Sequence, residues 1–413
     1  MTEHIDTVVI GGGQAGLAIS YCLTQQRRPH VVLEKHRIGE AWRSGKWDSF
    51  TLVSPNWTLQ LPGFHYRGAD PDGYLTREEV VRYLEDYARL FDPPVRTGVT
   101  VTCVRDDADG FAVETDKGAL LATNVVVATG AFQKPRIPSF AAQIAPHIHQ
   151  IHSSQYRNPD SLAPGAVLVV GSGQSGCQIA EELYQRGRSV YLCTGKAGRL
   201  PRGYRGQDVF RWVNELGLFN QTVGSLDSPA ERFDANPQLT GKDGGRSLNL
   251  HQFARDGATL LGRLQGASGS KLSIAGDLMD NLASMDQMEA GFKEAVNRYI
   301  EQNGLQAPAE KHQPELRTGY DSAIVTELNL DEAGITSIVW AAGYTVDFSW
   351  IQFPIFDEFG YPHHQRGITA QPGLYFIGLL WLHTSKSNLF FGMGDDAAYI
   401  AAHIAQRVYE AKQ

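Results

Sequence analysis

Two glycine-rich turns of the form Gly-x-Gly-x-x-Gly constrain this 413-residue chain more than any other feature. The first spans Gly11–Gly16 and the second spans Gly171–Gly176. Each follows a short apolar run and precedes apolar residues at helical spacing, which is the context that makes such a turn a dinucleotide site. The sequence therefore predicts an α/β fold with two Rossmann-like dinucleotide-binding domains.

The first unit carries every element of the dinucleotide fingerprint. A β-branched strand at 7–10 leads into the turn, a helix follows from Gln14, and the strand 30–34 ends in Glu34. The glycines permit the tight turn and the approach of the backbone to a pyrophosphate, while an acid at that distance binds ribose hydroxyls. A purely structural glycine turn is the alternative. The predicted contacts of the first cofactor are Gly11, Gly13, Gln14, Ala15, Gly16, Glu34, Lys35, Trp42 and Arg43.

The second unit lacks the acid. Its second strand ends at Thr194, and Lys196, Arg199, Arg202 and Arg205 follow. Cations without a carboxylate suit the 2′-phosphate of NADPH, although a solvated basic loop is the alternative. Changing Arg199 or Arg202 to Ala should then raise KM for NADPH and spare NADH. The predicted contacts are Gly171, Gly173, Gln174, Ser175, Gly176, Thr194, Arg199 and Arg202.

Three segments are predicted from the order of these patterns. Residues 1–160 form the first part of the domain that holds the first turn, 161–325 form the domain of the second turn with a helical insertion, and 326–413 complete the first domain. Helices are expected near 207–216, 251–264 and 285–303. Strands running into Thr129-Gly130 and into Gly378 predict further cofactor contacts at those residues, and Phe391 near the last helix joins them.

Composition narrows the classes of partner. The net charge is −8 without a basic run, which argues against nucleic acid or an anionic membrane as the main partner. No signal peptide and no membrane-length apolar stretch is seen, and the four cysteines are scattered, so we expect a reduced, cytoplasmic protein without a redox disulfide. The histidines between Pro146 and His152 lack further ligands at metal spacing, so no metal is expected. The oligomeric state is open, with a homodimer as one option.

The combined motifs resemble the class B flavin monooxygenases, over nearly the whole chain. The family pattern Ala-Thr-Gly-x4-Pro-x2-Pro is matched from Ala128 to Pro138, and Gly39–Trp42 approximates its Gly-Gly-x-Trp element. His152 and Tyr156 match the end of the family fingerprint, whereas Pro146 and Ile148 replace its Phe and Gly.

The resemblance implies FAD at the first turn and NADPH at the second, in a glutathione-reductase-like arrangement. Residues 1–160 and 326–413 would then be the FAD-binding domain and 161–325 the NADPH-binding domain. A FAD C4a-hydroperoxide would transfer one oxygen atom from O2 to nitrogen or sulfur of a small organic substrate. Baeyer–Villiger or C-hydroxylating chemistry, a non-oxygenating NADPH:acceptor flavin reductase or NADPH oxidase, and a redox-sensing binding protein are the alternatives. Trp47, Asn56 and Asn388 are predicted to line the flavin-side pocket. Core packing is the alternative for the tryptophans.

Overall fold

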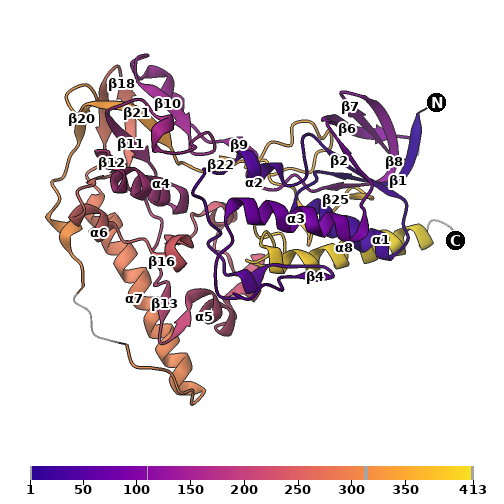
Figure 1. The fold of residues 1–413 in the computed structure, drawn as a ribbon. Coiled ribbons are helices and arrows are strands. Elements are labelled where there is room, and N and C mark those ends of the chain that lie inside the picture. The colour runs from indigo at the N-terminus through magenta and orange to yellow at the C-terminus, as the bar shows by residue number, and fades with distance from the viewer. Residues whose placement is uncertain (1, 109, 311–314, 411–413) are drawn as a thin grey trace.

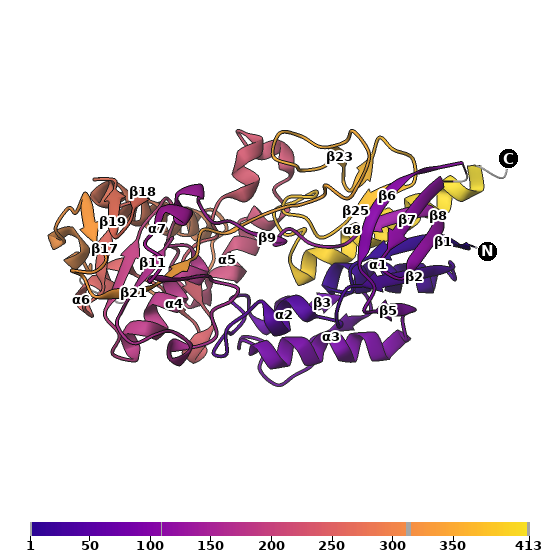
Figure 2. The same ribbon diagram turned by 90° about the horizontal axis from the view of Figure 1, so that it is seen from above.

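Two parallel sheets organise the chain, one behind each glycine turn. The computed structural model describes residues 2–108, 110–310 and 315–410. Each sheet belongs to its own α/β unit, and the two units lie side by side with the last helix returning to the unit that holds the N-terminus (Figures 1 and 2). The predicted fold class is therefore confirmed.

The first sheet has the strand order β23-β24-β25-β8-β1-β2-β5, with β7 and β6 continuing antiparallel from β8. The strands β25, β8, β1, β2 and β5 run parallel. The strands β1, β2 and β8 contain runs of Val, Ile and Leu buried on both faces, as expected of parallel strands covered by helices. The bounds are β1 Glu3–Ile10, β2 His30–Glu34, β5 Val95–Thr97, β6 Val101–Asp107, β7 Gly110–Thr115, β8 Gly118–Val127, β23 His364–Gln365, β24 Ile368–Thr369 and β25 Leu374–Phe376.

Three long helices pack beside this sheet (Figure 1). They are α1 (Gln14–Gln25), α3 (Arg77–Phe91) and α8 (Phe390–Glu410), and the short α2 (Glu40–Ser44) follows β2. Helix α3 begins with a complete capping box, because the Thr76 hydroxyl accepts from the Glu79 N–H and the Glu79 carboxylate accepts from the Thr76 N–H. It ends at Asp92 in the left-handed region, just before two prolines.

The second sheet is fully parallel, with the order β10-β21-β11-β12-β17. Its strands are β10 His149–His152, β21 Ile335–Trp340, β11 Ala166–Val170, β12 Val190–Cys193 and β17 Thr259–Leu261. The helices of this unit are α4 Gln174–Gln185, α5 Val209–Glu215, α6 Leu250–Arg255 and α7 Leu278–Gln302. A small antiparallel sheet adjoins it, formed by β18 Leu264–Ser268, β19 Lys271–Ile274 and β20 Glu327–Asn329.

The sheets place the unit boundaries differently from the sequence patterns. Strand β10 precedes the predicted limit at 160 and β21 follows the predicted limit at 325, yet both pair within the second sheet. The chain crosses between units at β9 (Lys134–Pro135) and returns at β22 (Tyr344–Thr345), and these two strands pair antiparallel. Parallel strands pair through contacts distant in sequence, so local patterns could not assign β10 and β21 to a sheet.

The predicted helix over 251–264 is wrong in its second half. Helix α6 ends at Arg255, and Gly257 adopts a positive φ of 98°. The following Thr259–Leu261 adds a parallel strand to the edge of the second sheet. An apolar run this short suits either a helix or a strand, and tertiary pairing decided for the strand. The other two predicted helices correspond to α5 and α7.

The C-terminal part of the first unit contains a histidine that stays neutral in the fold. His364 accepts a hydrogen bond at Nδ1 from the Gly367 N–H, 3.2 Å away, and its Nε2 has no partner within the described residues. Burial, reinforced by Arg232 and His363, lowers the pKa of His364 from 6.5 to about 4. Unfolding exposes an imidazole of ordinary pKa, which takes up a proton below pH 6.5.

This histidine predicts a loss of stability as the pH falls from 6.5 to about 4. Over that window the unfolded chain binds a proton at His364 that the folded chain does not, so the free energy of unfolding decreases. We expect a contribution on the order of 1–2 kcal/mol for this half-buried group. Urea unfolding between pH 4 and 7 measures it, with His364→Asn as the comparison. Parallel pH curves for the two proteins would contradict the assignment.

Candidate dinucleotide sites

The first glycine turn has the shape that a pyrophosphate requires. Gly11 has a positive φ of 112°, and a Cβ there would lie 2.7 Å from the carbonyl oxygen of Ala128. A Cβ on Gly16 would lie 1.8 Å from the Gly11 carbonyl oxygen, so this glycine permits the close contact of helix and strand. Beside Gly13 no described residue other than its two chain neighbours has an atom within 4 Å of a built Cβ. That open space, at the start of α1, is where the backbone can approach a phosphate.

Glu34 stands at the end of β2 as predicted. Its Oε2 accepts from the Gly12 N–H at 2.5 Å, and its Oε1 accepts from the His36 N–H at 2.8 Å. The carboxylate is half-buried and fixed against the turn. Each oxygen keeps a further lone pair, so both can still accept from ribose hydroxyls. The residues of the first unit therefore fit the adenosine half of a dinucleotide such as FAD.

The C-terminal part of the chain completes this site. Gln14 Nε2 donates to the carbonyl oxygen of Asn388 at 2.9 Å, which joins the first turn to the segment before α8. Gly378, two residues after β25, approaches Ala15 so closely that a Cβ built on it would lie 2.7 Å from the Ala15 Cβ. Gln14 Oε1 is buried without a partner among the described residues, which leaves an acceptor for a bound ligand.

The aromatic residues of the predicted pocket divide into two groups. Trp47 is buried in the core against Phe50, so the core-packing alternative holds for it. Trp42 is half-buried and stacks on Phe390, the first residue of α8, at a ring distance of 5.9 Å. Phe391 is also half-buried and lies 6.1 Å from Trp57.

Asn56 lies buried beside this aromatic group. Its amide donates to the Asp70 carbonyl at 2.9 Å, and its Oδ1 has no partner within the described residues. The side chain thus has an acceptor to offer, as a pocket residue needs.

The other predicted contacts of the first site differ in whether their side chains are free to contact a ligand. Lys35 is exposed, and the exposed Thr129 accepts from Gln133 Nε2 at 2.9 Å. Gly130, which follows, has a positive φ of 72°. Arg43 is instead paired with Glu85, so its charge is neutralised within the chain.

One cation near this site was missed in the sequence. The Lys46 ammonium lies 5.1 Å from the ring of Phe50 and 5.6 Å from that of Trp42, without a carboxylate partner in the described chain. Burial lowers its pKa to about 8. The density of tryptophans around it was the available signal, because ammonium groups are attracted to aromatic faces.

The second turn repeats the geometry of the first. Gly171 has a φ of 110°, and a Cβ there would lie 2.6 Å from the Ala341 carbonyl oxygen. A Cβ on Gly176 would again meet the carbonyl oxygen of the first glycine at 1.8 Å. Where Glu34 stands in the first unit, the second has neutral groups: the Gly195 N–H donates to the Ser172 hydroxyl at 3.1 Å. Ser175 is half-buried at the start of α4.

Thr194 does not offer its hydroxyl to a ligand. It donates to the Leu261 carbonyl at 2.8 Å and accepts from Asn281 at 3.1 Å, and the residue is buried. Lys196, two residues later, is exposed and makes no ion pair with any described residue.

The two arginines predicted to bind the phosphate are buried in ion pairs within the chain. Arg199 pairs with Asp286 at 2.7 Å and with Glu289, and it donates to Asn249 at 2.8 Å. All of its donor nitrogens therefore have partners. The binding of a phosphate by Arg199 and Arg202 stays a prediction, but the ion pairs favour a structural role for both side chains.

Arg202 connects the two units. Its Nε donates to Asp208 at 2.7 Å and its Nη1 to the carbonyl oxygen of Val53 in the first unit, also at 2.7 Å. The guanidinium stacks 4.2 Å from the ring of Tyr74, whose hydroxyl donates to the same Asp208.

Part of the segment that the sequence left unassigned covers the start of α8. Residues 218–225 form the 3-10 helices η4 (Leu218–Asn220) and η5 (Val223–Ser225). Val223 N–H donates to the His383 carbonyl and Ser385 N–H to the Gln221 carbonyl, at 3.1 and 3.0 Å. Phe219 packs edge-on to Phe391 at 4.9 Å. Phe219 is buried in this contact, and Phe391 is half-buried.

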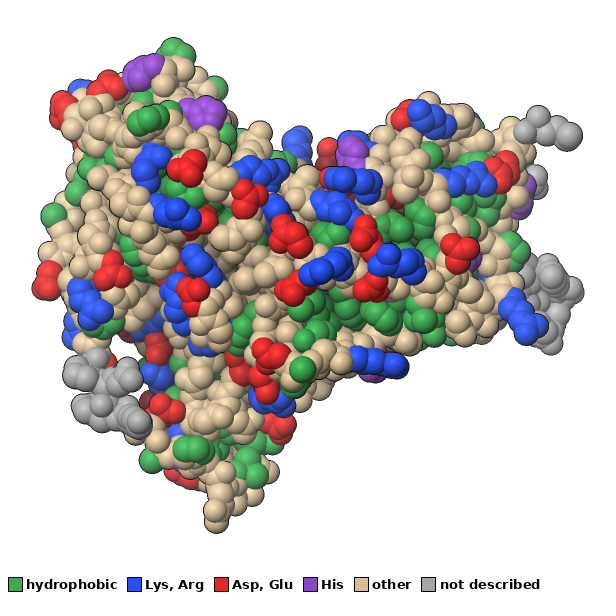
Figure 3. Space-filling view, viewed as in Figure 1, with side chains coloured by type: hydrophobic (Ala, Val, Ile, Leu, Met, Phe, Trp, Pro, Cys, Tyr) green, Lys and Arg blue, Asp and Glu red, His purple; other side chains and the backbone are tan. Residues whose placement is uncertain are grey.

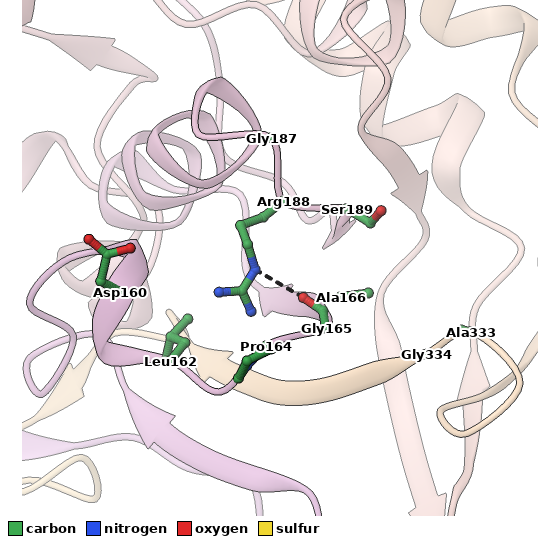
Figure 4. A pocket seen from close by; sticks show the side chains of 10 residues that line it. All are labelled: Asp160, Leu162, Pro164, Gly165, Ala166, Gly187, Arg188, Ser189, Ala333 and Gly334. Carbon is green, nitrogen blue, oxygen red and sulfur yellow. Dashed lines mark hydrogen bonds between the residues drawn. The ribbon is translucent and has the colours of Figure 1, made fainter.

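A cavity of about 640 Å³ lies at the end of the second sheet opposite the second glycine turn (Figure 4). It is bordered by residues before β11, β12 and β21, that is, by the amino ends of these strands. Arg188 points into it and donates to the Gly165 carbonyl at 3.0 Å. Dinucleotides bind at the carboxyl ends of parallel strands, so this cavity is separate from the glycine turns.

The surface and the cysteines show no competing chemistry in the described part of the chain. Basic and acidic side chains are interspersed on the face drawn in Figure 3. The four cysteines are unpaired, and burial raises the pKa of each of them. Across the described residues no group of three or more His, Cys, Asp or Glu could hold a metal. None of the described helices combines the length and apolarity needed to span a bilayer.

Residues 8–214 match the family described as pyridine nucleotide-disulphide oxidoreductase, and this chain belongs to that family. It is 35% identical over 403 residues to a CzcO-like uncharacterized oxidoreductase of Geobacillus kaustophilus, covering 97% of this chain and 98% of the relative. A flavin-containing monooxygenase from Stenotrophomonas maltophilia has a similar structure, with TM-score 0.67, 19% identity and coverage of 98% and 100%. The structure of OTEMO complexed with FAD and NADP is also similar, with TM-score 0.57, 16% identity and coverage of 98% and 86%.

These comparisons confirm the predicted class, an oxidoreductase that uses a pyridine nucleotide. They also confirm the predicted likeness to flavin monooxygenases at the level of the fold. The predicted pair, FAD and NADP, agrees with the family and with this fold.

Proposed function

We propose that this chain is an NADPH-dependent flavin monooxygenase that transfers one oxygen atom to nitrogen or sulfur of a small organic molecule. In this proposal FAD binds at the first glycine turn and NADPH binds at the second. The observation that carries the proposal is the pair of equivalent turns, of which only the first has a carboxylate of the described residues against it. Two dinucleotide sites in one chain suit the transfer of a hydride from one cofactor to the other.

The residues of the chain supply binding and exclusion of water. Glu34 and the N–H groups at the start of α1 hold the adenosine and phosphate part of FAD, and Gln14 and Asn388 fix the first turn against the C-terminal part. When bound, flavin and nicotinamide supply the hydride transfer and the activation of O2. Residues 218–225 cover the start of α8. This cover would limit the entry of water, which would otherwise release the activated oxygen as hydrogen peroxide before it reaches the substrate.

An absorbance spectrum followed by NADPH titration tests this proposal. The purified protein should show flavin bands that NADPH bleaches without air. In air, NADPH and O2 should be consumed in equal amounts with one oxygenated product from a panel of amines, sulfides and ketones. An ester from a ketone would instead support Baeyer–Villiger chemistry. Hydrogen peroxide equal to all the O2 consumed, throughout the panel, would contradict oxygen transfer and support the NADPH oxidase alternative.

Lys196 is our candidate for the 2′-phosphate, because it is exposed and makes no ion pair with any described residue. We expect Lys196→Ala to raise KM for NADPH about tenfold and to change KM for NADH less than twofold, since a phosphate contact of an exposed lysine has about this value. Steady-state kinetics with both nucleotides measures it. Lys117→Ala, which removes an exposed lysine in the turn between β7 and β8, should leave both values unchanged. Equal losses for both nucleotides would place the phosphate elsewhere.

A further inference from the structure

The two glycine turns differ in what stands over them. Around a Cβ built on Gly13, no described residue other than the chain neighbours has an atom within 4 Å. Around a Cβ built on Gly173, the Cβ of Ala235 lies 3.6 Å away. Gly173 is the second glycine of its motif, the one whose missing side chain lets a pyrophosphate approach the backbone. Ala235 therefore stands where the phosphate of a nucleotide would come in.

Ala235 belongs to a segment fixed to the second unit on one side. Gln174, the first residue of α4, donates through Nε2 to the Pro237 carbonyl at 3.0 Å. Gln238 donates through Nε2 to the Ser172 carbonyl at 2.7 Å and through its backbone N–H to the Gly198 carbonyl at 2.9 Å. Gln238 is fully buried, and its Oε1 has no partner within the described residues. An acceptor is thus left unused beside the second turn.

The other side of the segment is fixed to the C-terminal part of the first unit. Arg232 lies 3.7 Å from the Asp357 carboxylate and 4.7 Å from the ring of Tyr361. Phe233 packs against Phe359 and Tyr361, with ring distances of 6.1 Å to both. Between the two anchors, residues 234–236 are exposed. Residues 232–238, here called the strap, therefore cross from one unit to the other over the second turn.

We propose that the strap gates the second dinucleotide site. The strap and a pyrophosphate compete for the space beside Gly173, so binding of the nucleotide displaces residues 234–237 while the anchors at Arg232 and Gln238 hold. Lifting the strap breaks the contact from Gln174 to Pro237, which frees an amide at the start of α4 for the ligand. This gating rests on the proposed function, which places NADPH at this turn.

The gate predicts the kinetics of NADP+ binding to the flavin-loaded protein. Stopped-flow detection of the change in flavin absorbance, without turnover, should give an observed rate that saturates with NADP+ concentration, because opening of the strap limits it. Arg232→Ala removes an anchor and should raise the limiting rate about tenfold. Arg96→Ala, which removes an exposed ion pair with Glu3 far from the strap in sequence, is the matched control and should leave the rate unchanged.

A second series tests the gate without touching an anchor. Ala235 is exposed, so Ala235→Gly and Ala235→Val should both fold, with faster and slower NADP+ binding respectively. Hydrogen exchange in a peptide covering 232–238 should become faster when NADP+ is bound.

Unchanged rates in these variants, together with unchanged exchange in that peptide, would overturn the gate even if NADP+ binds. Failure of NADP+ to bind any variant, with no bleaching of flavin by NADPH, would instead overturn the proposed function.

Discussion

Gly13→Ala is expected to give a folded protein that has lost its flavin. The backbone at Gly13 has a φ of −84°, which any residue adopts, and apart from its chain neighbours no described residue has an atom within 4 Å of the added methyl. The chain itself therefore has room for the substitution. The methyl would instead occupy the space through which the pyrophosphate approaches the turn, and overpacking of this kind weakens FAD binding about 10- to 100-fold.

The ratio of flavin to protein absorbance and the melting temperature of the flavin-free protein measure this effect separately. Gly291→Ala is the matched control, because Gly291 lies within α7 and also has no atom near a built Cβ. It should keep the flavin and the stability. A Gly13→Ala protein that retains flavin at the wild-type ratio would show that the pyrophosphate does not lie at the first turn.

Arg199→Ala is expected to destabilise the fold strongly. The guanidinium is 9% exposed and lies between Asp286 and Glu289 on α7. Burial by itself would raise the pKa of Asp286, but Tyr320, Arg199 and His251 together hold it below its usual value. Removing the arginine leaves two carboxylates partly buried without their main counter-charge, and the cost of breaking such a pair is about 3 kcal/mol or more.

Urea unfolding of the variant measures this cost, alongside Arg96→Ala. Arg96 and its partner Glu3 are 44% and 49% exposed, so the loss of that solvent-screened ion pair should leave the unfolding free energy nearly unchanged. A stable Arg199→Ala protein with a higher KM for NADPH alone would restore the phosphate role that the sequence suggested.

Much of the fold follows from local patterns in the sequence. The runs ending at Ile10 and Val170 are apolar enough to be buried on both faces, and each leads into a turn that only glycine can make. Strand, turn, helix and acid are close in sequence, so their geometry is nearly fixed by steric and hydrogen-bonding rules. The capping box at Thr76 is equally local.

The partners of the site residues depended on long-range packing. Gln14 meets Asn388 across 374 residues, and Arg199 meets acids of α7 that no motif connects to it. Basic residues after a strand predict a positively charged loop. Whether acidic side chains neutralise that charge depends on which elements pack against the loop in the folded chain. For the same reason the strap over Gly173 left no signal near the motif that it covers.

The sequence by itself determined that this chain has two dinucleotide turns and that only the first has an acid behind it. These properties depend on glycine stereochemistry and on residue identity within about twenty positions. Only the tertiary structure decided which cations stay free, which strands join the second sheet, and that Ala235 stands over the second turn. Those outcomes depend on contacts between residues distant in sequence. Close packing of the folded chain allows one arrangement of these contacts, and the local sequence pattern does not indicate which one.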